Sequence, residues 1–234
     1  MRYAEDIQPI ERYLLMLLLA PDSSGKFSQP IRGNTWCQKE MFVLSKLVEG
    51  LEEDTQFDAY AMGSYSETVA EIQDQFYISG FAEKSGDGMK LSLDGRRLAE
   101  EVWTHATEDE RRVVGEVKSW LNDLSFHELL ALLYTEYPES AKKSQVKDEI
   151  DIRRPELAVS LVRKRIVTPE LGARIARMKQ ADFSSYLEKR GISPEGIETS
   201  DILVDKSLLE EIEKSRDDSA KRKLIPWEKI KENA

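Results

Sequence analysis

The chain has 234 residues, of which 40% are hydrophobic and 33% charged, a balance typical of a soluble globular protein with one large or two small domains. Its single cysteine, Cys37, excludes an internal disulfide and a cysteine-based zinc site, and it suits a cytoplasmic location. The net charge of −10 is unevenly distributed. Residues 1–150 carry 28 acidic and 16 basic side chains, whereas residues 153–190 carry 4 acidic and 10 basic ones, so we expect two modules with different partners.

The first predicted helix runs from about Ile7 to Leu19 and includes eight consecutive apolar residues, 13–20. A helix needs about 20 apolar residues to cross a bilayer, and charged residues and Pro21 flank this run. It also lacks the residue order of a secretion signal. We therefore expect a buried core helix and no membrane partner.

Two further helices are predicted before residue 81. The first begins near Asn34, and its expected buried stripe consists of Trp36, Leu44, Leu47 and Val48. The next begins with Ser64 and Glu67, which have capping-box spacing, and ends at Gly80. Its expected buried face consists of Tyr65, Val69, Ile72 and Phe76.

Residues 81–93 alternate apolar and polar at Met89, Leu91 and Leu93, and Gly86-Asp87-Gly88 predicts a tight turn between two strands. Another helix should follow Asp94-Gly95. Three helices and then a β-hairpin is the order of a winged helix-turn-helix. The exposed face of the third helix carries Glu67, Glu71 and Asp74, which would repel phosphates, so we expect this module to mediate dimerisation or protein contact.

Two more helices are indicated by capping boxes, Thr107 with Glu110 and Ser125 with Glu128. They predict a helical hairpin that closes a first domain, residues 1–138. The polar residues 139–154 form the expected linker.

A basic helix-turn-helix module is predicted at residues 155–200. Its first helix begins at Pro155, the second begins at Thr168-Pro169, and the third runs from about Gln180 to Lys189 and stops at Gly191. If this module binds DNA, the exposed polar and basic side chains are the candidate contacts. These are Arg163, Lys164, Arg165, Arg174, Lys179, Gln180, Ser184, Ser185, Lys189 and Arg190. The alternative is a solvated basic face on a helical bundle.

Catalytic chemistry has little support in the sequence. His105 and His127 lie on separate predicted helices without a partner of metal-ligand or nucleophile type, and Cys37 reads as a small core residue. No glycine-rich phosphate loop is present. We therefore expect neither an enzyme nor a bound metal or cofactor.

The tail, residues 201–234, combines an amphipathic helix, a charged break and an apolar segment with a tryptophan. Such segments often become ordered when they bind a partner. The alternatives are a frayed terminus and a segment that docks on the protein itself. The candidate partner-binding residues are Leu208, Leu209, Ile212, Leu224, Ile225 and Trp227.

The stretch from Pro155 to Ile192 resembles a family of short prokaryotic helix-turn-helix proteins that is predicted to contain antitoxins. The matching residues are Leu157, Leu161, Ile166, Thr168, Gly172, Ala173, Ile175, Ala176, Met178, Phe183, Leu187, Gly191 and Ile192. Where that family has glycine in the turn, this chain has Arg177.

The first domain is similar to uncharacterised archaeal and bacterial winged-helix proteins. The resemblance rests on Gly63-Ser64-Tyr65-Ser66, where the family has Gly-Pro-Tyr-Ser, and on Leu91, Leu93 and Gly95. The tail is similar to the toxin-wrapping tails of small antitoxins.

The resemblances imply a mainly α protein with an N-terminal winged helix, a C-terminal helix-turn-helix and a partly flexible tail. The implied function is a DNA-binding transcriptional regulator of antitoxin type. It would act as a homodimer whose tail binds a toxin. The alternative is an adaptor that binds only proteins.

Overall fold

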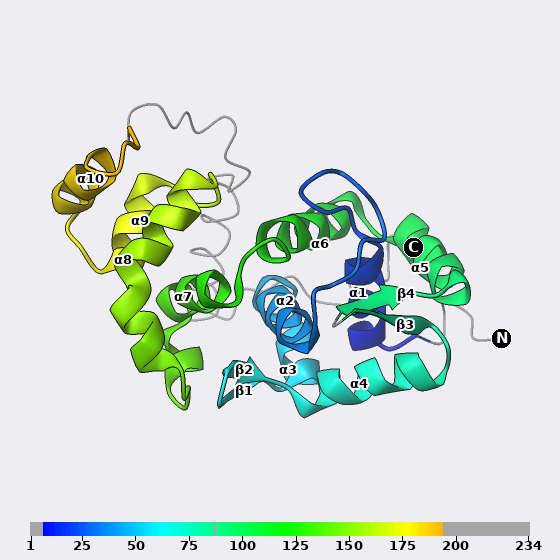
Figure 1. Cartoon of the computed structure of the whole chain (residues 1–234). Helices are drawn as coiled ribbons and strands as arrows, with labels where there is room; N and C mark the ends of the chain where they lie inside the picture. Colours follow the sequence, from blue (N-terminus) through cyan, green and yellow to red (C-terminus); the bar gives the residue numbers. More distant parts are fainter. Residues whose placement is uncertain (1–6, 87, 194–234) are drawn as a thin grey trace. The chain divides into compact units, whose positions relative to one another are not determined.

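The computed structural model describes residues 7–86 and 88–193, and within them the protein is mainly helical with two small two-stranded sheets (Figure 1). The described chain divides into two compact units, residues 7–58 with 64–123 and residues 59–63 with 124–193. The division after Asp123 differs from the expected boundary at residue 138. The reason is that the helix beginning at Phe126 packs on the helices that follow it.

The elements of the first unit are mostly helices. They are α1 (Pro9–Leu19), α2 (Asn34–Leu47), α3 (Leu51–Thr55), α4 (Glu67–Ile78), β3 (Ala82–Ser85), β4 (Gly88–Leu91), α5 (Leu93–His105) and α6 (Glu108–Leu121). Strands β1 (Asp58–Tyr60) and β2 (Gly63–Tyr65) pair with each other at the division between the units. The second unit contains α7 (Phe126–Glu136), η2 (Pro138–Ala141), α8 (Lys147–Arg163), α9 (Pro169–Ala176) and α10 (Gln180–Glu188).

Helix α1 forms the centre of the first unit, as the sequence predicts. Its residues from Tyr13 to Leu19 are all buried, and it packs against α5, α6, α3 and β4. A helix that is apolar on every side needs this complete cover. Among the described residues, no helix combines the length and the apolar character needed to cross a membrane.

The buried stripe of α2 differs from the expected one. Trp36, Leu47 and Val48 are only partly buried, whereas Cys37, Met41 and Leu44 are fully buried, so the helix is rotated relative to the prediction. Helix α3 and strands β1 and β2 were not predicted. They are too short to give a clear periodic pattern.

The start of α4 corrects the proposed capping box. Ser64 lies in β2, and the helix is capped by Ser66, whose hydroxyl accepts a hydrogen bond from the Val69 amide at 3.1 Å. The expected face with Val69, Ile72 and Phe76 is buried. Tyr65 belongs to β2 and is not part of that face.

The predicted hairpin is present, with Ala82 opposite Leu91 and Ser85 opposite Gly88. Ile31, just before α2, adds an antiparallel bridge to Met89. This explains Gly88, whose backbone does not have a positive φ: a Cβ there would lie 2.4 Å from the Ile31 carbonyl oxygen. Gly88 therefore permits close approach and does not shape the turn.

Helix α5 begins earlier than expected, at Leu93, with Ser92 as its cap. Leu93 is 69% exposed, so it does not continue the buried alternation of β4. Gly95 lies in the first turn of the helix, where a Cβ would lie 1.8 Å from the Phe81 carbonyl oxygen.

Both remaining capping boxes are confirmed. The Thr107 hydroxyl accepts from the Glu110 amide and the Ser125 hydroxyl accepts from the Glu128 amide, with each glutamate bonded back to the amide of its cap. These boxes start α6 and α7. The two helices belong to different units, so they do not close one domain together.

Helix α8 includes half of the expected linker, because it begins at Lys147 and continues through Pro155. A proline inside a helix removes one backbone hydrogen bond and usually marks a helix start. Here the helix is held by buried side chains on both sides of Pro155, namely Ile150 and Arg154 before it and Leu157 and Ala158 after it.

Candidate nucleic-acid interface

The second unit contains a short helix, a three-residue turn and a second short helix, in the part of the chain predicted to read DNA. Helix α9 begins as expected, with the Thr168 hydroxyl accepting from the Leu171 amide at 3.2 Å and Pro169 in the first position. It packs on both α8 and α10. Figure 1 shows these three helices next to one another.

The turn depends on a residue in the left-handed region. Arg177 has φ 55° and ψ 39°, the conformation that glycine adopts without a steric penalty. The Met178 amide then donates to the Ala173 carbonyl at 3.0 Å, which closes the end of α9. Arg177 therefore takes, at the end of α9, a backbone conformation in which glycine is more common.

Close packing between α9 and α10 depends on Gly172. A Cβ at this position would lie 2.7 Å from a ring carbon of Phe183 and 2.7 Å from a methyl carbon of Val162. Phe183 and Leu187 are the two buried residues of α10. The absent side chain at Gly172 thus makes room for the aromatic ring that joins α10 to α9 and α8.

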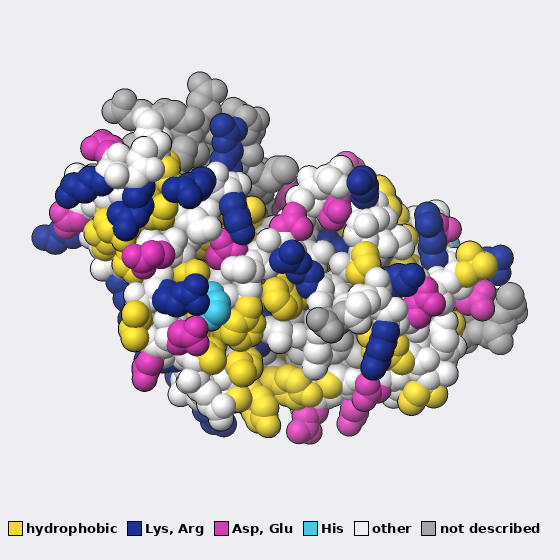
Figure 2. Space-filling model, in the orientation of Figure 1, with side chains coloured by type: hydrophobic (Ala, Val, Ile, Leu, Met, Phe, Trp, Pro, Cys, Tyr) yellow, Lys and Arg dark blue, Asp and Glu magenta, His cyan; other side chains and the backbone are white. Residues whose placement is uncertain are grey.

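The candidate DNA-contacting residues are largely at the surface. All of them are exposed except Ser184, which is half-buried. Figure 2 shows lysine and arginine side chains over the visible face of α9 and α10. Since almost all of the candidates are exposed, exposure does not show which of them are available to DNA. Their ion pairs do distinguish them.

Three of the basic candidates are bound to acidic side chains of the same unit. Lys164 contacts Glu128 at 2.7 Å, and Arg174 contacts Glu136 at 3.1 Å; both glutamates are buried. Arg190 lies over the Tyr186 ring, 3.5 Å from its centroid. It also lies 3.9 Å from Glu156. These contacts connect α7, α8, α9 and α10 and leave the three cations less available to phosphates.

Glu128 shows how strong one of these contacts is. Burial acts to raise the pKa of Glu128, but hydrogen bonds from Lys164, Ser160 and Ser125 outweigh it and lower the pKa to about 2. The carboxylate is therefore charged at neutral pH and binds Lys164, the residue that follows α8. Lys164 therefore suits a role in stabilising the second unit better than a role in contacting DNA.

Among the basic candidates, Arg163, Lys179 and Lys189 are exposed and have no ion pair with a described residue. Lys179 is the N-cap residue of α10. Next to it, the Gln180 amide donates to Glu170 at 2.8 Å. Arg165 has a left-handed backbone with φ 58° at the end of α8. The cations at the two ends of α10 are therefore the best placed to meet an anionic partner.

The sequence reading missed Arg154, which it placed in the linker. Its side chain is only 3% exposed and donates to Asp151 at 2.7 Å, to the Thr135 hydroxyl at 2.8 Å and to the Ile175 carbonyl at 3.2 Å. These acceptors lie on α8, α7 and α9. A usable signal existed, because Arg154 falls at helical spacing between the apolar residues Ile150 and Leu157.

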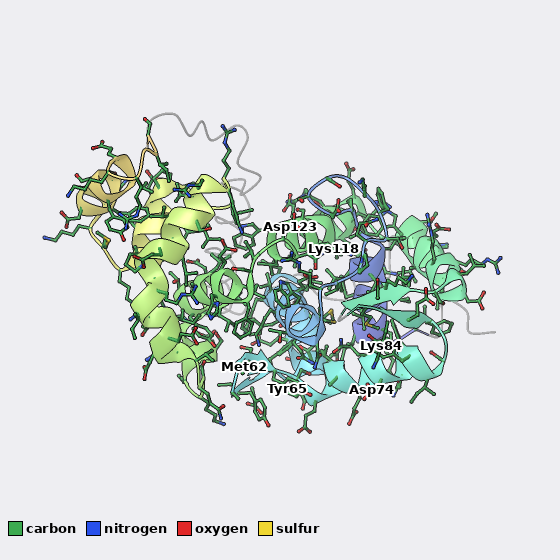
Figure 3. All side chains as sticks on the ribbon, in the orientation of Figure 1. Met62, Tyr65, Asp74, Lys84, Lys118 and Asp123 are labelled. Carbon is green, nitrogen blue, oxygen red and sulfur yellow. The ribbon has the colours of Figure 1, made fainter. Side chains whose placement is uncertain are left out.

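The first unit presents a surface of opposite charge. Glu67, Glu71 and Asp74 are exposed on α4, as expected, and Figure 3 labels Asp74 there. Their spacing places them on one side of the helix, opposite the buried Val69, Ile72 and Phe76. This face is unsuited to phosphate contact.

A buried lysine also belongs to the first unit. Lys118 of α6, labelled in Figure 3, is fully buried and donates to the carbonyls of Leu17, Leu18 and Gln29 at 2.9, 3.3 and 2.7 Å. Burial lowers its pKa and raises the pKa of the nearby buried Glu40, whose carboxylate oxygens have no hydrogen-bond partner in the described chain. The contacts of Lys118 are those of a structural clamp between α6, the end of α1 and the loop before α2.

The remaining chemically reactive side chains have structural contacts. His105 Nδ1 lies 2.9 Å from the Glu101 carbonyl, and His127 Nε2 lies 2.7 Å from Glu149. Cys37 is fully buried, and burial raises the pKa of its thiol. Within residues 7–86 and 88–193, no three histidine, cysteine or acidic side chains are grouped closely enough to hold a metal ion.

The predicted partner-binding residues of the tail, from Leu208 to Trp227, lie outside the described residues. Comparisons with protein-family models, curated proteins and solved structures found no match to this chain.

Proposed function

We propose that this protein is a DNA-binding transcriptional regulator of antitoxin type, with α9 and α10 as its helix-turn-helix. The observation that carries the proposal is the second unit's eight-residue helix, left-handed turn at Arg177 and nine-residue helix, with a cation at each end of α10 that has no ion pair to a described residue. In a helix-turn-helix the second helix enters the major groove through its N-terminal residues, here Lys179 and Gln180. Arg163 and Lys189 are the proposed phosphate contacts.

We assign a supporting role to the first unit. Apart from the short α3, β1 and β2 between α2 and α4, the order α1, Ile31 bridge, α2, α4 and the β3–β4 hairpin suits a winged helix. Its acidic α4 face favours contact with protein, in line with a homodimer that places two α10 helices on a two-fold operator.

The test is fluorescence anisotropy of the full chain with its own promoter duplex and a scrambled duplex of equal length, at several salt concentrations. The three basic candidates without an ion pair to a described residue predict a slope of log affinity against log salt of about −3 for each bound protomer. Lys179→Ala with Gln180→Ala should remove the preference for the promoter. The control Arg97→Ala, on α5 in the first unit, should bind as the wild type does. No salt-sensitive binding to either duplex contradicts the proposal.

The tail, residues 201–234, is the proposed toxin-binding segment, and Leu208, Leu209, Ile212, Leu224, Ile225 and Trp227 are its candidate contacts. Deleting residues 201–234 should abolish toxin binding and leave DNA binding unchanged. Loss of both activities, or of neither, contradicts this division.

An adaptor that binds only proteins is the second candidate, and the exposed acidic face of α4 favours it. A partner captured by the wild type and lost on Glu71→Lys with Asp74→Lys, combined with a flat salt response in the DNA assay, would support the adaptor.

A further inference from the structure

The turn between α9 and α10 is connected to the middle of α8 by two arginines that share one carboxylate. Arg177 donates to Asp151 Oδ2 at 3.0 Å, and Arg154 donates to Asp151 Oδ1 at 2.7 Å. Burial acts to raise the pKa of Asp151, but the hydrogen bond and charge of Arg154, together with Arg177, lower it. Asp151 therefore stays charged at neutral pH and holds both guanidinium groups.

The two arginines differ in their surroundings. Arg177 is 56% exposed, and a pair of that kind contributes little stability by itself. Arg154 is buried, so its geometry is fixed by Thr135 and by the Ile175 carbonyl in the last turn of α9. A cation there also suits the negative end of the α9 dipole. The buried arginine orients Asp151, and Asp151 in turn orients the exposed turn residue.

We propose that Arg154 and Asp151 are positioning residues that set the orientation of α10 through Arg177. This inference rests on the proposed function, because α10 is the helix assigned to the major groove. A reading helix has to be held to within about 0.5 Å of its productive position. The left-handed backbone at Arg177 turns the chain between α9 and α10, and the contact of the Arg177 side chain with Asp151 fixes the direction in which α10 leaves the turn.

Replacing Asp151 distinguishes a purely electrostatic effect on DNA binding from a positioning role, because the two predict opposite changes in DNA binding. Asp151→Asn removes a negative charge, so electrostatics alone would tighten binding to any DNA. Asparagine keeps one carbonyl oxygen as an acceptor for a single arginine. The matched control is Glu149→Gln, which removes the same charge from α8 but faces His127 and Arg153, at 2.7 and 3.4 Å.

Two readouts are needed, both on the full chain. The first is the ratio of promoter to scrambled-duplex affinity at one salt concentration. We expect Asp151→Asn to lower this ratio about tenfold and Glu149→Gln to leave it unchanged. An unchanged or higher ratio for Asp151→Asn overturns the inference.

The second readout is hydrogen exchange without DNA. Asp151→Asn and Arg154→Lys should speed exchange in the turn and in α10 while the amides of the first unit keep their protection. Unchanged exchange in α10 overturns the positioning role whether or not DNA binds. Faster exchange in a protein whose wild type binds no DNA would instead confirm the anchoring of α10 and contradict the proposed function.

Discussion

At the scale of single residues, the sequence predicts the burial of an uncharged side chain such as Cys37 but not the burial of charged side chains. Cys37 was correctly placed in the core because a small sulfur side chain needs no partner there. Lys118 and Arg154 were not placed, because lysine and arginine are rarely buried. Both lie at helical spacing from buried apolar residues; Lys118, for example, lies between Val114 and Leu121. The carbonyl groups that accept their hydrogen bonds, however, belong to segments distant in the sequence.

Lys118→Met should destabilise the first unit strongly. The change leaves two buried carbonyls and one partly buried carbonyl without their donor, and losses of this kind cost roughly 3–5 kcal/mol. Urea unfolding at pH 7 measures the effect. Lys84→Met, at an exposed position of β3, is the control and should change the midpoint little. Equal midpoints for the two variants would contradict the structural role of Lys118.

Glu128 should make the second unit sensitive to acid. Because its pKa in the folded protein is about 2, below the ordinary 4.5, its stabilisation is complete above about pH 4.5 and is lost as the pH falls toward 2. Lys164 is partly exposed, so we expect a loss of roughly 1–3 kcal/mol. Thermal unfolding between pH 6 and 2.5, compared with Glu128→Gln, measures it. If the variant shows the same loss in this range, Glu128 is not its source.

At the scale of elements, α2, α6, α7, α9 and α10 begin where the sequence predicts, and α4, α5 and α8 do not. Thr107 and Ser125 were identified because the cap and its glutamate are three residues apart. Ser64 has the same spacing but lies in β2, because the Ser66 hydroxyl caps α4. Helix α8 was shortened in the prediction because Pro155 was read as its first residue. Tertiary contacts, which no local pattern contains, decided both cases.

The contact between α9 and α10 predicts that replacing a helical glycine by alanine lowers the stability of the second unit, the opposite of the usual effect. Alanine is normally better than glycine inside a helix by about 1 kcal/mol. Gly172→Ala should nevertheless destabilise the second unit by roughly 1–3 kcal/mol, since its methyl group would overlap Phe183 and Val162. Gly115→Ala on α6 meets only Pro21 carbons at 3.9 Å and should be neutral or stabilising. Thermal unfolding compares the two, and a stabilising Gly172→Ala would contradict the packing described.

At the scale of the whole molecule, the sequence predicted two modules of different charge, and the structure has two units, although it divides them after Asp123. The charge difference has a structural counterpart in the acidic face of α4 and the cations around α10. The sequence overestimated the free positive charge of the second unit. It could not show that Glu128, Glu136 and Glu156 lie against Lys164, Arg174 and Arg190.

We propose that DNA binds to α10 and not to α4, and hydrogen exchange of the full chain with and without the promoter duplex tests this most directly. At low salt, we expect added DNA to slow exchange at the turn around Arg177 and in the first turn of α10, and to leave α4 unchanged. Slower exchange confined to α4 or the β3–β4 hairpin would contradict the claim. No change anywhere, at a duplex concentration that saturates the anisotropy signal, would contradict it equally.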